Sequence, residues 1–76
     1  MSNQYKSALH YASEELQTDL NKYGIKVDLA ERMVVFRELA IPIRYGTTKV
    51  ECRRILKKTI KAAQNIEIKE NQESLL

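Results

Sequence analysis

The feature that most constrains this 76-residue sequence is a strongly amphipathic segment in its C-terminal half. Thr48-Lys49-Val50-Glu51 is a complete capping box, in which the hydroxyl of Thr48 and the carboxylate of Glu51 bond backbone N–H groups at a helix start. From there to Ile66, apolar residues recur at the three- and four-residue steps of one helical face. The sequence therefore predicts a helix over 49–66. Its apolar face comprises Cys52, Ile55, Leu56, Thr59, Ile60, Ala63 and Ile66.

The opposite face of the same predicted helix is cationic. Between residues 49 and 66 there are six Lys or Arg residues and one acidic residue, Glu51, which gives this segment a charge of +5 in a chain whose net charge is +3. Like charges three and four residues apart on a helix repel by a few tenths of a kcal/mol per pair. A helix that served only for packing would gain nothing from this arrangement. The cationic residues are Lys49, at the edge of the face, and Arg53, Arg54, Lys57, Lys58 and Lys61.

Lys and Arg clustered along one helix form an electrostatic footprint for phosphates. We therefore predict a small non-enzymatic nucleic-acid-binding regulator, with DNA binding and transcription regulation as its expected role. Two alternatives stay open for this face: a solvated outer surface, or a docking site for an acidic protein. Glu14, Glu15 and Asp19 of the first segment could also lie opposite it. The candidate nucleic-acid-binding residues are Thr47, Thr48, Lys49, Arg53, Arg54, Lys57, Lys58 and Lys61.

The N-terminal part of the chain also predicts a helix, over 3–23. Its apolar and aromatic residues fall at helical spacing. Gly24 follows at the position where a left-handed residue ends many helices, and Lys22 lies in the last turn, where a cation interacts favourably with the helix dipole. The apolar and aromatic positions are Tyr5, Leu9, Ala12, Leu16, Leu20 and Tyr23.

Another helix is predicted over 29–40. Asp28-Leu29-Ala30-Glu31 approximates a capping box with Asp in the place of Ser or Thr, and Pro42 is incompatible with continuing the helix. Apolar residues cover most sides of this segment, which indicates a central, buried element. The run Met33-Val34-Val35-Phe36 is β-prone, so a strand is the alternative there.

Together these segments predict an all-α fold, a small three-helix bundle with helices over 3–23, 29–40 and 49–66. Residues 1–66 form a single helical domain, and residues 67–76, which lack sustained periodicity, form a disordered, flexible polar tail. With no Trp and one Phe, the core is small and mostly aliphatic. Small cores often gain stability from a second copy, so a homodimer is expected.

Three helices with a basic last helix resemble helix-turn-helix modules in architecture alone, because the connection over 41–47 is longer than the ~3–4-residue turn of that motif. In such a module the start of the last helix faces the base edges, and the rest of its basic face grips phosphates. The expected base readers are Thr47, Thr48, Lys49 and Arg53. The expected phosphate contacts are Arg54, Lys57, Lys58 and Lys61.

A second hypothesis is a protein-binding regulator or adaptor, such as an inhibitor of a larger enzyme. It would use apolar surface of the helices predicted over 3–23 and 29–40. Phosphate binding weakens steeply with salt, whereas an apolar interface hardly responds to it. Salt dependence therefore separates the two hypotheses.

The sequence carries no catalytic, cofactor or metal signature. His10 has Glu14 one turn away but no convergent metal ligands, and Cys52 fits a buried thiol on the packing face better than a reactive one. We therefore expect no enzyme, no cofactor, no metal and no small-molecule substrate. A single cysteine, no signal-peptide pattern and no apolar run of ~20 residues favour a soluble cytoplasmic protein with no membrane partner.

Overall fold

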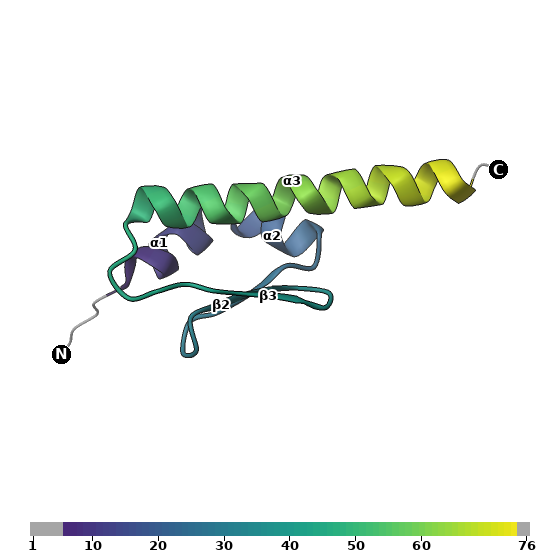
Figure 1. The fold of residues 1–76 in the computed structure, drawn as a ribbon. Helices are drawn as coiled ribbons and strands as arrows, with labels where there is room; N and C mark the ends of the chain where they lie inside the picture. Colours follow the sequence, from purple (N-terminus) through teal and green to yellow (C-terminus); the bar gives the residue numbers. More distant parts are fainter. Residues whose placement is uncertain (1–5, 75–76) are drawn as a thin grey trace.

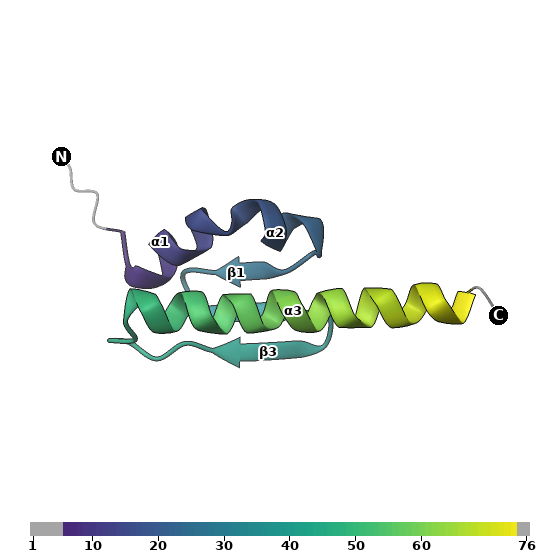
Figure 2. The same cartoon turned by 90° about the horizontal axis from the view of Figure 1, so that it is seen from above.

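The protein folds as a layer of helices on one face of a three-stranded antiparallel sheet (Figures 1 and 2). This computed structural model describes the backbone of residues 6–74 and the side chains of residues 6–71. The elements in chain order are α1 (Ala8–Glu15), α2 (Gln17–Lys22), β1 (Lys26–Asp28), β2 (Met33–Phe36), β3 (Leu39–Pro42) and α3 (Lys49–Ser74). The long helix α3 runs nearly parallel to the strands, with α1 and α2 beside it (Figure 2).

The expected all-α three-helix bundle is wrong, because the segment predicted as a helix over 29–40 forms β2, β3 and the turns next to them. Asp28 does make the hydrogen bond that its capping pattern predicts: its Oδ1 accepts a bond from the N–H of Glu31 at 2.9 Å. That bond closes the turn between β1 and β2 instead of starting a helix. The run Met33–Phe36 then extends as a strand, the alternative that its β-prone residues favoured.

The breadth of apolar residues in this segment reflects the two faces of a strand. Val34 and Phe36 are buried under the helices, whereas Met33 and Val35 are half-buried on the other side. Side chains alternate between the faces of a sheet with a period of two. When the apolar residues of 29–40 are placed on a helix, they fall on most of its sides. This distribution suggested a buried helix.

The turn between β2 and β3 consists of Arg37 and Glu38 and contains neither Gly nor Asn. Arg37 has a left-handed φ of 56°, an uncommon value for a residue with a side chain. Arg32, at the end of the turn between β1 and β2, also has a φ of 56°. Its guanidinium donates hydrogen bonds to the carbonyl oxygens of Ile43 (3.0 Å) and Arg44 (2.9 Å), which holds the segment between β3 and α3 against this turn.

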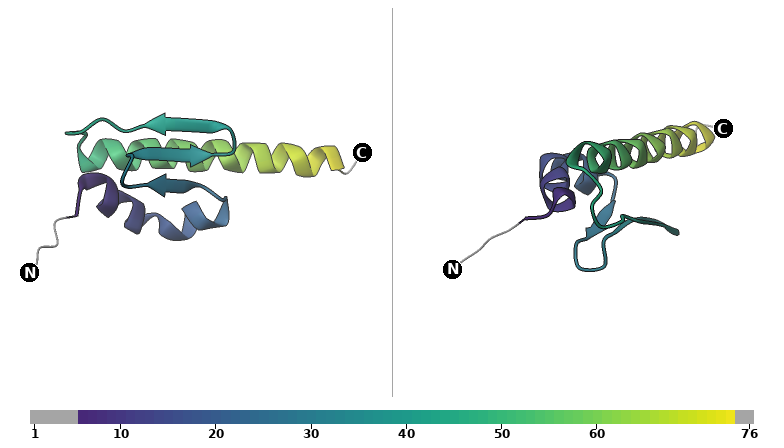
Figure 3. Two further views of the ribbon diagram at one scale, coloured as in Figure 1. Left: turned by 90° about the horizontal axis from the view of Figure 1, so that it is seen from below. Right: turned by 60° about the vertical axis from the view of Figure 1, so that its left-hand side comes forward.

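The sheet has β2 in the centre and leaves one of its faces uncovered. Val27, Val34 and Ile41 lie opposite one another across the three strands and face the helices. Their neighbours along each strand point to the other side, which none of the described elements covers (Figure 3, left). We call this side the open face. Its residues are Lys26, Asp28, Met33, Val35, Ala40 and Pro42.

The core lies between α1, α3 and the helix-facing side of the sheet. Leu9, Leu56 and Val34 contribute one nearly inaccessible side chain from each of α1, α3 and β2, with exposures of 0%, 0% and 1%. Cys52 is also 0% exposed, which confirms the predicted buried thiol. The other buried apolar residues are Ala12, Leu20, Ile25, Phe36, Ile43, Ile60 and Ala63.

The helix predicted over 3–23 is interrupted. Ser7 caps α1 by accepting a bond from the N–H of His10 at 3.1 Å, and Leu16 (φ −110°, ψ 16°) breaks the helical geometry before α2. Gly24 has a φ of 71°, the left-handed conformation expected after a helix. Residues 3–5 of the prediction lie outside the described residues.

The start of α3 is confirmed, because the hydroxyl of Thr48 accepts a bond from the N–H of Glu51 at 3.2 Å. The helix then continues to Ser74, past the predicted end at residue 66, so residues 67–74 are helical where a disordered tail was expected. Residues 75–76 of that predicted tail lie outside the described residues. Its 26 residues span about 39 Å, and its last turns project beyond the sheet (Figure 1). Arg37 holds this projecting part by donating two hydrogen bonds to the carboxylate of Glu70, at 3.0 and 3.2 Å.

Candidate functional site

The basic residues of α3 line a groove beside the end of α1, the helix that packs against the first half of α3 (Figure 2). The groove has a volume of about 680 Å³, and five of the eight residues predicted to bind nucleic acid line it. We call it the basic groove. Its lining residues are Glu15, Leu16, Val50, Arg53, Arg54, Lys57, Lys58 and Lys61.

Glu15, the last residue of α1, supplies the acidic side chain among those that line the basic groove. Its carboxylate pairs with Nζ of Lys49 at 2.9 Å and with the guanidinium of Arg53 at 3.1 Å. The hydrogen bonds from Lys49 and Arg53 lower the pKa of Glu15 below its ordinary value, so this carboxylate is ionised at neutral pH. Glu15 therefore offsets one of the two positive charges at the start of α3, where the sequence allowed an acidic residue of the first segment to lie opposite the basic face.

The other end of the basic groove keeps its positive charge. Arg54 pairs with Glu51 at 2.6 Å, but both side chains are largely exposed, and such pairs contribute only about 0–1 kcal/mol. Lys57, Lys58 and Lys61 are exposed, and no carboxylate among the side chains of residues 6–71 pairs with them. Three uncompensated charges therefore lie within about 6 Å of helix length.

Thr47 and Thr48, two of the predicted base readers, already use their hydroxyl groups within the chain. Thr47 Oγ1 donates to the carbonyl oxygen of Arg44 at 2.7 Å, and Thr48 Oγ1 caps α3. The helix-turn-helix geometry that suggested a reading role is absent from the described chain, because strands precede α3. In this structure Thr47 therefore stabilises the turn before α3, and Thr48 caps the helix.

The two apolar residues that line the basic groove, Leu16 and Val50, were not predicted from the sequence. Leu16 is half-buried between α1 and α2, and Val50 is 57% exposed in the first turn of α3. Val50 lies within the capping box, and an apolar residue at that position does not by itself indicate a binding surface. Tyr11 does not line the basic groove, but it was not predicted either: it is 45% exposed, and its ring centre lies 5.5 Å from Nζ of Lys49.

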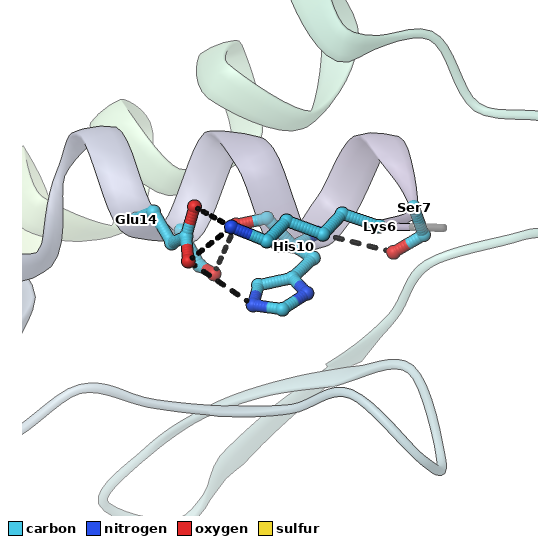
Figure 4. A network of polar contacts seen from close by, with 5 residues as sticks. Lys6, Ser7, His10 and Glu14 are labelled. Carbon is cyan, nitrogen blue, oxygen red and sulfur yellow. Dashed lines mark hydrogen bonds and ion pairs between the residues drawn. The ribbon is translucent and has the colours of Figure 1, made fainter. Parts of the chain in front are cut away.

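His10 belongs to a separate polar cluster on α1 (Figure 4). Glu14 accepts from Nζ of Lys6 at 3.2 Å and lies 3.3 Å from Nε2 of His10, the neighbour one turn away. None of these residues lines the basic groove. Within the described part of the chain, no three His, Cys, Asp or Glu side chains gather in a way that could hold a metal ion.

No known protein family, curated protein or solved structure matches this chain. Among residues 6–74, none of the helices has an apolar stretch that could reach across a lipid bilayer.

The burial of Cys52 makes its thiol a poor nucleophile. Desolvation is the main cause that raises the pKa of Cys52, and the nearby charge of Glu51 raises it further, whereas Arg32 lowers it. A raised pKa leaves less thiolate at any given pH, so the reactive form is scarce as well as inaccessible. We expect iodoacetamide to label the native protein at pH 8 at least about a hundredfold more slowly than the urea-unfolded chain. Equal labelling rates in the two states would contradict the burial.

Proposed function

We propose that this protein binds nucleic acid without catalysis, by holding phosphates in the basic groove. The observation that carries the proposal is the set of three exposed lysines, Lys57, Lys58 and Lys61, which have no acidic partner among the described side chains. Phosphate oxygens would supply the missing counter-charges and release condensed cations from the nucleic acid. A purely solvated face would not need like charges gathered along one side of α3.

The arrangement favours contact with the backbone over reading of bases. Arg54 can exchange its exposed pair with Glu51 for a bidentate bond to a phosphate, and the three lysines act as point charges beside it. Thr47 and Thr48 have their hydroxyl groups bonded within the chain. We therefore propose binding that depends little on base sequence.

Binding of an acidic protein is the second candidate. Leu16 and Val50 are the apolar residues that line the basic groove together with its cations, a combination that would suit an amphipathic helix with acidic edges. The adaptor hypothesis relied on apolar surface of helices over 3–23 and 29–40. The second of these segments forms strands, and Leu9, Ala12 and Leu20 of the first are buried in the core. An adaptor that binds an acidic protein would use the basic groove instead.

The test is fluorescence anisotropy with labelled random-sequence duplex DNA, duplex RNA and single strands, titrated at several salt concentrations. The variant Lys57→Gln/Lys58→Gln/Lys61→Gln should lose most of the affinity, and its salt slope on duplex DNA should fall by about three units, at 0.9 for each lost phosphate contact. The control Lys22→Gln/Arg44→Gln/Lys69→Gln removes the same charge away from the basic groove and should bind nearly as well as the wild type. Equal losses in the two variants, or no binding at low salt, would refute the proposal.

Glu15 is expected to limit the affinity of the basic groove, because its carboxylate occupies Lys49 and Arg53 and repels phosphates. Substitution Glu15→Gln should free both cations, tighten binding several-fold and steepen the salt slope by about two units. The same titration checks this, with Glu14→Gln as the control on the same helix. If Glu15→Gln weakens binding, the ion pairs would instead be needed to position Arg53.

A further inference from the structure

The open face of the sheet differs from the basic groove in charge and in residue type. Met33, Val35, Ala40 and Pro42 are apolar, and the two charged residues of the open face, Lys26 and Asp28, cancel each other. Lys26, Asp28, Ala40 and Pro42 are exposed, while Met33 and Val35 are half-buried. An apolar and neutral surface of this kind suits neither phosphates nor an acidic protein.

The strand register places these residues in two rows. Lys26, Val35 and Ala40 lie opposite one another in the first row, and Asp28, Met33 and Pro42 do so in the second. The helix-facing row of Val27, Val34 and Ile41 runs midway between them. Each row thus contains one charged residue, on the edge strand β1, and two apolar residues, on β2 and β3.

The two rows are complementary to each other under a two-fold rotation. An axis that lies over the middle row, parallel to the open face and across the strands, exchanges the first row with the second. It sets Lys26 opposite Asp28 of a second copy, Val35 opposite Met33, and Ala40 opposite Pro42. Opposite charges would meet at the rim and apolar side chains would meet in the centre, which is the self-complementarity that an isologous interface requires.

We propose that the open face is a dimer interface in which two copies of this chain pack sheet on sheet. Two sheets can stack about 10 Å apart with their strands within about 30° of alignment, which brings the inner side chains into contact. Burial of Met33 and Val35 would supply most of the affinity. The two rim pairs of Lys26 with Asp28 would fix the orientation, because rim charges set specificity more than affinity.

This dimer would place both basic grooves on its outer surfaces. The helix α3 covers the side of the sheet opposite the open face, as Figures 1 and 3 show, so the two copies of α3 would lie on opposite sides of the assembly. The dimer does not depend on nucleic-acid binding. If both hold, the assembly would bridge two nucleic-acid strands or segments.

The sharpest test is a charge-reversal mixture studied by sedimentation equilibrium without nucleic acid. Lys26→Asp alone places like acids at the rim and Asp28→Lys alone places like bases there, so each variant alone should lose the dimer that the wild type forms. An equimolar mixture of the two should regain it as a heterodimer. The double variant Lys26→Asp/Asp28→Lys should also dimerise, although it loses the Asp28 bond to Glu31.

A second variant tests the centre of the interface. Val35→Lys should raise the dimer dissociation constant by at least about tenfold, since a buried charge would replace an apolar contact. Ile68→Lys, at a 55% exposed position of α3, adds the same charge elsewhere and should leave the dimer intact. Circular dichroism establishes that each variant is folded. A wild-type monomer at all concentrations, or a dimer in which Val35→Lys and both single reversals have no effect, would overturn the proposal.

Discussion

Replacing Leu56 with alanine is expected to lower the free energy of unfolding by about 2–5 kcal/mol. Leu56 is 0% exposed and belongs to the buried cluster between α1, α3 and the sheet, so the substitution removes apolar burial and leaves a cavity. A domain of this 76-residue size has a total stability of about 4–11 kcal/mol. The substitution would therefore remove a large share of the stability.

Urea unfolding followed by circular dichroism measures this effect as a shift of the midpoint with an unchanged slope. Ile68→Ala is the matched control, because Ile68 is on the same helix and 55% exposed. That variant should change the free energy of unfolding by no more than about 0.5 kcal/mol. Similar losses in both variants would mean that α3 does not pack through Leu56.

Val34→Lys should strongly destabilise the protein, whereas Val35→Lys should leave the stability of each chain nearly unchanged. Val34 is 1% exposed beneath the helices, and Val35 points to the open face. Burying an unpaired ammonium in place of Val34 would cost about 4 kcal/mol or more, a large share of a total stability of about 4–11 kcal/mol. Val35→Lys keeps its charge in water in the monomer and loses only contacts on the open face.

Far-UV circular dichroism and the urea midpoint of the two variants separate a strand from a helix in this segment. Adjacent residues of a strand point to opposite faces, so their effects should differ strongly. If residues 33–36 belonged to a helix that was apolar on most sides, both lysines would be harmful. Comparable destabilisation by Val34→Lys and Val35→Lys would contradict the sheet.

The elements that could be predicted are those whose signals are local. The start of α3 at Thr48 depends on a hydroxyl and an N–H three residues apart, and the left-handed Gly24 depends on one residue alone. The extension of α3 to residue 74 could not be predicted from apolar periodicity, because these turns project beyond the core. Good helix-forming residues and the contact of Glu70 with Arg37 stabilise them instead.

The hairpin of β2 and β3 was missed because its turn carries no usual signal. Arg37 adopts a left-handed conformation, and a Gly or Asn at that position would have indicated a hairpin turn in the sequence. Asp28, in the preceding turn, accepts the same hydrogen bond from the residue three positions on that it would accept at a helix start. A short apolar run fits a buried helix and a two-sided strand equally well by pattern. Pairing with Lys26–Asp28 and Leu39–Pro42 decides between them, and that pairing is not visible in the run itself.

The cationic side of the candidate site could be predicted because the helical period assigns each residue of an amphipathic helix to one face from sequence spacing alone. The pairing of Arg53 with Glu15 could not be predicted from apolar periodicity, because 38 positions separate the two residues. Only the packing of α1 on α3 brings them together. The same packing brings Leu16 and Val50 to the lining of one groove, the basic groove. The sequence was enough to assign the positive charges to one face of the helix. Which of these charges has an acidic partner could be seen only in the tertiary structure.

The projecting end of α3 also changes how the protein would behave in a hydrodynamic experiment. The molecule measures 56 × 20 × 19 Å, and its radius of gyration is 14.1 Å. A compact chain of 76 residues would have a radius of gyration of about 11 Å. A single copy should therefore diffuse more slowly and leave a gel-filtration column earlier than a spherical protein of equal mass. An early elution volume would be the signature of a rod-like monomer as much as of a pair, whereas the mass from light scattering does not depend on shape.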